Sequence, residues 1–137
     1  RMLAQPERAV IAEGTQMLGA IRRAQINERD STSSSVYLAV AAYNPVTATA
    51  VPTTWTRLGL GQLPTTSKFQ YTCALATETT TTTGTTTVPP TCTATRINVL
   101  GVPPAGGGTI AMDIDTGAVT CGGTYTGVLT PQGTTCR

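Results

Sequence analysis

Histidine is absent from this chain of 137 residues, and lysine occurs only once, as Lys68. The sequence therefore lacks the commonest metal ligand among the side chains. The four cysteines show no Cys-x-x-Cys spacing, which excludes both a typical zinc site and a thioredoxin-like redox motif. With these uses excluded, disulfide bonds are the expected role of the cysteines, and we predict no cofactor.

Charged residues are also scarce, because they make up 12% of the chain and the formal net charge is +2. The basic residues are scattered and are not interleaved with aromatic residues, so the sequence lacks the electrostatic footprint of a nucleic-acid-binding protein. It also contains no apolar run long enough to cross a bilayer and no signal-peptide pattern. We therefore expect any export segment to lie upstream of Arg1.

The clearest feature that is present is one amphipathic helix, expected over residues 6–29. Pro6 suits the first helical position, and arginines near the other end suit the helix dipole. The side expected to pack on the protein core consists of Leu3, Val10, Gly14, Met17, Leu18, Ile21 and Ala24. The other side is small or apolar where a monomer would carry charge, which predicts a subunit interface at Ala9, Ala12, Thr15, Gly19, Ala20 and Ile26.

After this helix the periodicity changes. Residues 36–43 fit either a short strand or a further helical turn, and residues 44–67 are predicted to form a connecting loop anchored on the core by Trp55. From Lys68 onward apolar residues alternate, so that one face of the first strand carries Phe69, Tyr71, Cys73 and Leu75. Further strands are predicted over residues 91–100, with Ile97 and Val99 on one face and Arg96 and Asn98 on the other, and over residues 109–114, with Ile110, Met112 and Ile114 on one face.

Residues 115–117 predict a turn that leads into a last strand over residues 118–121. The fold class predicted is α+β, with one N-terminal amphipathic helix packed on an antiparallel β-meander. We expect one domain over residues 1–137, with the helix in 1–30, a connecting region in 31–67, and the sheet and C-terminal disulfide region in 68–137.

Four cysteines allow three disulfide pairings. The pairing of Cys73 with Cys92 and of Cys121 with Cys136 is preferred, because each bond then closes a local loop. Disulfides imply folding outside the cytosol. Threonine is the most unusual component, with thirty residues. The threonine runs at 79–83 and 85–87 resemble O-glycosylated stalks, so surface glycans are one expectation, but a polar loop is the simpler interpretation.

Several stretches of the chain resemble the type IV pilin and pseudopilin family. Residues 13–25 look like the C-terminal half of a pilin spine helix, residues 58–64 and 68–71 are similar to the linker and first strand, and residues 94–96 and 110–117 resemble later strands and their turn. The resemblance implies that an N-terminal apolar helix, the family's strongest signature, has been removed. Cys121 and Cys136 bracket the C-terminal segment as a pilin disulfide often does.

This resemblance implies a structural subunit of an extracellular type IV pilus-like filament, with no enzymatic activity. Its partners would be further copies of the chain, and the inner membrane before assembly, reached through a segment not included in the sequence. One alternative is a periplasmic pseudopilin of a type II secretion system. A second alternative is a monomeric secreted binding domain, which would have a solvated helix and aromatic residues clustered on a loop.

A few motifs suggest other chemistry. Asp113 and Asp115 are the only metal candidates, for calcium, but solvated turn carboxylates are the favoured interpretation. Residues 115–118, Asp-Thr-Gly-Ala, match the catalytic tetrapeptide of aspartic proteases, in which two such aspartates share a proton. The chain has only one copy, and Asp-Thr-Gly is also common in turns, so a turn is the favoured interpretation. Arg22 and Arg23 are expected to be exposed to solvent, because surface arginines usually are.

Overall fold

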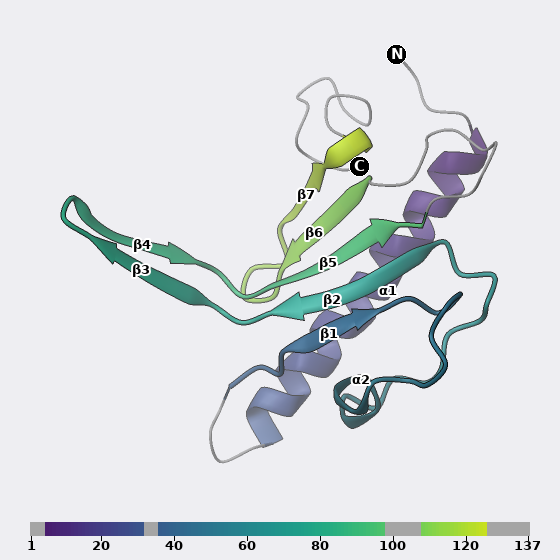
Figure 1. Ribbon diagram of the computed structural model, residues 1–137, viewed down its shortest axis with the longest axis horizontal. Coiled ribbons are helices and arrows are strands. Elements are labelled where there is room, and N and C mark those ends of the chain that lie inside the picture. The colour runs from purple at the N-terminus through teal and green to yellow at the C-terminus, as the bar shows by residue number, and fades with distance from the viewer. Residues whose placement is uncertain (1–4, 32–35, 98–107, 126–137) are drawn as a thin grey trace.

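The computed structural model describes residues 5–31, 36–97 and 108–125 of the chain. Within these residues a long helix, α1 (Gln5–Ser31), precedes a sheet that is interrupted by one short helix (Figure 1). The remaining elements are β1 (Val40–Tyr43), α2 (Thr53–Arg57), β2 (Phe69–Ala74), β3 (Thr77–Thr81), β4 (Gly84–Val88), β5 (Thr91–Arg96), β6 (Thr109–Asp113), β7 (Val119–Gly122) and a 3-10 turn (Gly123–Tyr125).

The main sheet has five antiparallel strands in the order β1-β2-β5-β6-β7. α1 lies across one face of this sheet and contacts β5 and β6, which gives two layers around one core (Figure 1). The α+β class and the antiparallel meander predicted from the sequence are therefore confirmed.

The predicted helix over residues 6–29 is confirmed, but its buried stripe is rotated from the expected one. Leu18 and Ile21 are fully buried, Gly14 is buried against Phe69, and Val10, Met17 and Ala24 are only partly buried. The prediction missed Ile11 and Gln25, which are both buried. Gln25 was missed because a search for apolar periodicity treats a polar amide as an outward-facing residue. Leu3 lies outside the described residues.

Strand alternation determines which side chains reach the helix. In β2, Phe69, Tyr71 and Cys73 are buried, as predicted, whereas Leu75 lies beyond the end of the strand and is exposed. In β5 the face that carries Arg96 is the buried one, because its side chain points inward and is 4% exposed. Its guanidinium donates to the carbonyls of Lys68 and Ile97, which makes burial of the charge tolerable.

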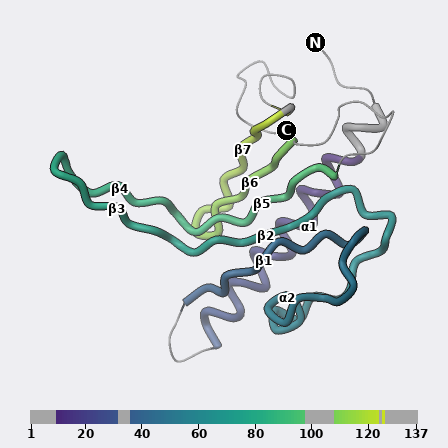
Figure 2. The backbone as a smooth tube through the Cα atoms, in the orientation of Figure 1, coloured from purple at the N-terminus to yellow at the C-terminus, as the bar shows by residue number. Residues whose placement is uncertain are grey.

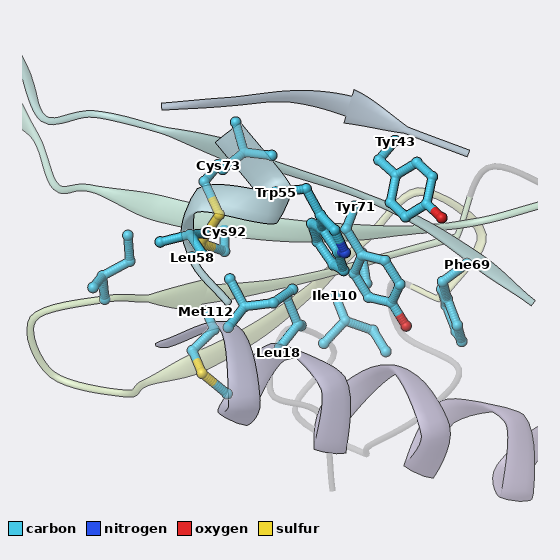
Figure 3. Close-up of a cluster of buried hydrophobic side chains, with 14 of the residues drawn as sticks. Leu18, Tyr43, Trp55, Leu58, Phe69, Tyr71, Cys73, Cys92, Ile110 and Met112 are labelled. Carbon is cyan, nitrogen blue, oxygen red and sulfur yellow. A yellow bond between two sulfur atoms is a disulfide. The ribbon is translucent and has the colours of Figure 1, made fainter. Parts of the chain in front are cut away.

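Aromatic side chains fill the centre of the core (Figure 3). The rings of Tyr43 and Trp55 are 5.1 Å apart, and those of Trp55 and Tyr71 are 5.9 Å apart. The Trp55 indole also donates a hydrogen bond of 2.9 Å to the Gly61 carbonyl. Trp55 is thus the predicted core anchor, although the region predicted as a connecting loop also forms β1 and α2. Residues 36–43 were predicted to form either a strand or a helical turn. The structure has a strand over residues 40–43 and neither element over residues 36–39.

Cys73 and Cys92 are directly opposite each other on β2 and β5 and form a disulfide, as predicted. Both residues are buried. Cys121 is also disulfide-bonded, and its predicted partner, Cys136, lies outside the described residues. The bond between Cys73 and Cys92 joins the neighbouring strands β2 and β5 at the end from which the threonine-rich segment leaves the sheet.

That threonine-rich segment is a β-hairpin, so its interpretation as a polar loop is wrong. β3 and β4 pair only with each other, from Thr77 opposite Val88 to Thr81 opposite Gly84. Every residue of the hairpin is exposed, and it projects away from the sheet as an arm, which both views show (Figures 1 and 2). β-branched threonine favours the extended conformation. Pro89 and Pro90 separate β4 from β5, since proline cannot donate to a ladder.

Candidate functional site

The outer face of α1, turned away from the sheet, is the surface predicted to contact other subunits. Ala12, Gln16, Arg23 and Asn27 are exposed there. Of the predicted interface residues, Gly19 and Ala20 are partly buried within the molecule, as are Thr15 and Ile26 on the flank. Ala9 belongs to α1, but its side chain lies outside the described part. The face therefore combines small residues at Ala12, Gly19 and Ala20 with polar side chains, and Arg23 is the charged one among its four exposed residues.

A set of polar contacts attaches α1 to the rest of the molecule. Arg22 donates from Nε to the Ile114 carbonyl at 2.7 Å and from a terminal nitrogen to the Asp115 carbonyl at 3.2 Å. The expectation that Arg22 is free in solvent is therefore wrong. Its position one turn beyond the buried Leu18 directs it to the turn between β6 and β7, which sequence spacing within the helix could not show.

Gln25 makes a second attachment, to the segment that follows the helix. Its amide nitrogen donates to the Leu38 carbonyl at 2.6 Å, and its amide oxygen accepts from the Leu38 backbone nitrogen at 2.8 Å. Both hydrogen-bonding groups of a buried amide are thereby satisfied. Glu28 adds an ion pair of 3.1 Å with Arg57 of α2.

The aspartates proposed as metal candidates are used by the turn between β6 and β7. One oxygen of Asp113 accepts from the backbone nitrogens of Asp115 and Thr116, and Asp115 accepts from the Tyr37 hydroxyl at 2.7 Å. Arg29 donates to that same hydroxyl. Burial, then the bond to Asp115, raises the pKa of Tyr37. In the part of the chain that the structure describes, no three histidine, cysteine or acidic side chains are grouped to hold a metal.

A hollow of about 430 Å³ opens beside the outer face of α1. It lies between the helix residues Glu13, Gln16, Met17 and Ala20 and the segment Leu63–Ser67, and Tyr71 contributes to its wall. Glu13 ties the two sides together, because one of its oxygens accepts from the Lys68 backbone nitrogen at 3.0 Å. The hollow and the outer face share Gln16 and Ala20, so one neighbouring molecule could cover both.

Tyr71 is the feature of this hollow that sequence reasoning missed as a functional residue. Its side chain points from β2 towards α1, and the residue is 2% exposed (Figure 3). Among the described residues no group hydrogen-bonds to its hydroxyl. Burial, and secondly the charge of Glu13, raises the pKa of Tyr71, so the phenol stays protonated. The alternation of β2 showed that Tyr71 is buried, but nothing local showed that its hydroxyl lacks a partner.

Comparison with family models, curated proteins and solved structures finds no match for this chain. The geometry of the chain itself therefore carries the functional argument. Within the described residues, no helix combines the length and hydropathy that a membrane crossing needs.

Proposed function

We propose that this chain is a structural subunit of an extracellular pilus-like filament, in which copies assemble through α1. The observation that carries the proposal is that α1 is held firmly on the sheet by one face while its other face is left uncovered by the described residues. Side chains project little from the middle of that uncovered face, because the residues there include Ala12, Gly19 and Ala20. Small side chains allow close approach between helix backbones, as at helix pairs elsewhere.

The shape of the molecule is compatible with open-ended assembly. A filament needs a heterologous contact, in which two different patches meet and the rotation does not close into a ring. The outer face of α1 has two unlike flanks, one beside the hollow at Glu13 and one over Gly19. The arm of β3 and β4, in which Glu78 is the one charged residue, extends outward from the end of β2 and β5, so it would stay outside a bundle of helices (Figure 1).

Two other assignments receive less support. A pseudopilin of a type II secretion system would use the same packing, but the long threonine arm suits a surface exposed to the outside, where glycans would also attach. A monomeric secreted binding domain should present aromatic residues on a loop. Instead Trp55, Phe69, Tyr43 and Tyr71 are all in the core.

The proposal is tested by Ala12→Arg, which places a long cation at the centre of the outer face. Ala12 is exposed, so the variant should fold normally. We expect wild-type protein to self-associate as its concentration rises and to form filaments visible by electron microscopy, and the variant to remain monomeric. Sedimentation velocity measures association, and circular dichroism measures folding.

Thr80→Arg is the matched control, because it adds the same charge at an exposed position on the arm. It should associate like the wild type. Wild-type protein that stays monomeric at every concentration, or filaments of unchanged abundance from Ala12→Arg, would contradict the proposal.

A further inference from the structure

The hollow beside α1 has an unfilled hydrogen-bonding capacity. The Tyr71 hydroxyl, although almost fully buried, has no partner among the described residues, and a buried polar group without one is rare. The Glu13 carboxylate next to it uses one oxygen for the Lys68 backbone nitrogen and leaves the other available. A carboxylate oxygen and a phenol oxygen that face one hollow form a suitable site for a guanidinium, which is planar and only donates.

The chain itself carries a guanidinium of the required kind. Arg23 is exposed on the outer face of α1, and within the described residues it forms no ion pair or hydrogen bond. Its side chain extends back over Gly19, where a terminal nitrogen would lie 3.6 Å from an added Cβ. Arg23 therefore lies on the outer face in line with Gln16, about two helical turns further along α1, and it is not part of the hollow's lining. Arg22 cannot play this part, because it is bonded to the turn between β6 and β7.

We propose that Arg23 of one copy inserts into the Glu13–Tyr71 hollow of the next copy, pairing with Glu13 and donating to the Tyr71 hydroxyl. The proposal rests on the proposed function, and it names the contact by which α1 of one copy recognises α1 of another. Charge complementarity selects a second copy as the occupant, since Glu13 gives the lining of the hollow its one carboxylate and Arg23 is an exposed cation elsewhere on the same helix. Arginine and carboxylate form strong, directional pairs.

This contact would also set the direction and stagger of assembly. The donor and the acceptor are different patches on one helix, so the contact is heterologous and each copy can use both at once. Glu13 and Arg23 are ten positions apart in the sequence. At about 1.5 Å per helical residue, neighbouring parallel helices would be staggered by roughly 15 Å.

A charge exchange tests the pairing. Glu13→Arg makes both patches basic, and Arg23→Glu makes both acidic, so each variant alone should associate about tenfold more weakly than wild type or worse. An equal mixture of the two variants should associate again. The basic hollow of Glu13→Arg can then take the acidic side chain at position 23 of Arg23→Glu, and the acidic hollow of Arg23→Glu can take Arg23 of Glu13→Arg. The double variant should associate as well. Sedimentation velocity at low salt, where surface charges are least screened, measures each case.

Two further variants protect the test against misfolding. Glu13→Gln keeps an oxygen for the Lys68 backbone nitrogen and removes only the charge, and it should still weaken association. Glu78→Arg, on the exposed arm, makes the same change in net charge as Glu13→Arg and should have no effect. Single variants that associate like wild type, or a mixture no better than its components, would overturn the pairing.

The outcome separates this proposal from the one on which it rests. If wild type assembles and Ala12→Arg does not, while the charge variants behave like wild type, α1 remains the assembly surface and the Arg23 contact is refuted. If wild type never assembles, both proposals fail.

Discussion

The two tyrosines beside Trp55, Tyr43 and Tyr71, are equally buried but their hydroxyl groups have different surroundings. The Tyr43 hydroxyl accepts from the Leu63 backbone nitrogen at 3.2 Å. The Tyr71 hydroxyl has no such partner in the described part of the chain. A hydrogen bond contributes about 1 kcal/mol to stability, whereas an unpaired buried group only adds a desolvation penalty.

We therefore expect Tyr71→Phe to leave the free energy of unfolding at neutral pH unchanged, or to raise it by up to about 1 kcal/mol. Tyr43→Phe is the matched control and should lower it by about 1 kcal/mol, because it removes the bond to Leu63. Urea denaturation followed by fluorescence of Trp55 measures both. A loss of stability in Tyr71→Phe as large as in Tyr43→Phe would show that the Tyr71 hydroxyl is bonded in the monomer.

The raised pKa of Tyr71 predicts a loss of stability in alkaline solution. In the unfolded chain the phenol releases its proton near its ordinary pKa of about 10, whereas in the folded chain it holds the proton to higher pH. The contribution of the protonated Tyr71 to the free energy of unfolding is thus complete below about pH 10. As the pH rises further, the free energy of unfolding falls by about 1.4 kcal/mol per pH unit. Urea unfolding at increasing pH should show this decline in wild type. In Tyr71→Phe the free energy of unfolding should fall less steeply with pH, because one fewer proton is released on unfolding.

Within α1, two glycines illustrate the difference between its two faces. A Cβ added at Gly14 would lie 2.9 Å from a ring carbon of Phe69, whereas at Gly19 the nearest atom would be 3.6 Å away on the flexible Arg23. Gly14 is therefore needed for close packing of the helix on the sheet. Nothing in the described subunit requires Gly19 to lack a side chain, which agrees with a role between subunits.

We expect Gly14→Ala to lower the free energy of unfolding by about 1–3 kcal/mol, since it overpacks the contact with Phe69. Gly19→Ala should raise it by about 0.5–1 kcal/mol through helix propensity. Thermal unfolding monitored by circular dichroism distinguishes them. Equal effects of the two substitutions would mean that the faces of α1 are wrongly assigned.

The strands show how far a local pattern reaches. Alternation correctly grouped the buried residues of β2 and of β6 on one face of each strand, because successive side chains of a strand point to opposite faces. In β5 alternation placed Arg96 opposite Ile97 but did not show which of the two faces is buried. Cys92, Ala94 and Arg96 form one inward row, and the guanidinium is satisfied by carbonyls at the end of the strand.

Considered as a whole, the molecule consists of a core and an arm that depend on each other little. β3 and β4 pair only with each other, and isolated two-stranded hairpins are marginally stable in water. The disulfide between Cys73 and Cys92 lies at the root of the arm and restrains the strands from which it extends. The arm is therefore expected to contribute to surface contacts and not to folding.

Replacement of residues 77–88 by a short flexible Gly-Asn-Gly link should leave the core folded, since Thr77 and Val88 face each other at the base of the arm and a short link can join the chain there. We expect the free energy of unfolding to change by less than about 1 kcal/mol, because the excised residues are all exposed. Denaturation of the shortened protein against wild type, with the disulfide intact in both, measures the change. Loss of cooperative unfolding would contradict this division.

The sequence by itself determined the helix, the strands from Lys68 onward and the class of the fold, and it favoured the pairing of Cys73 with Cys92, because periodicity and short separations are local properties. It suggested a small-residue surface on α1 as well. Only the tertiary structure decided what faces that surface. The rotated stripe, the attachment of Arg22 and the unpaired Tyr71 hydroxyl beside Glu13 depend on which distant segments meet, and no local pattern contains that information.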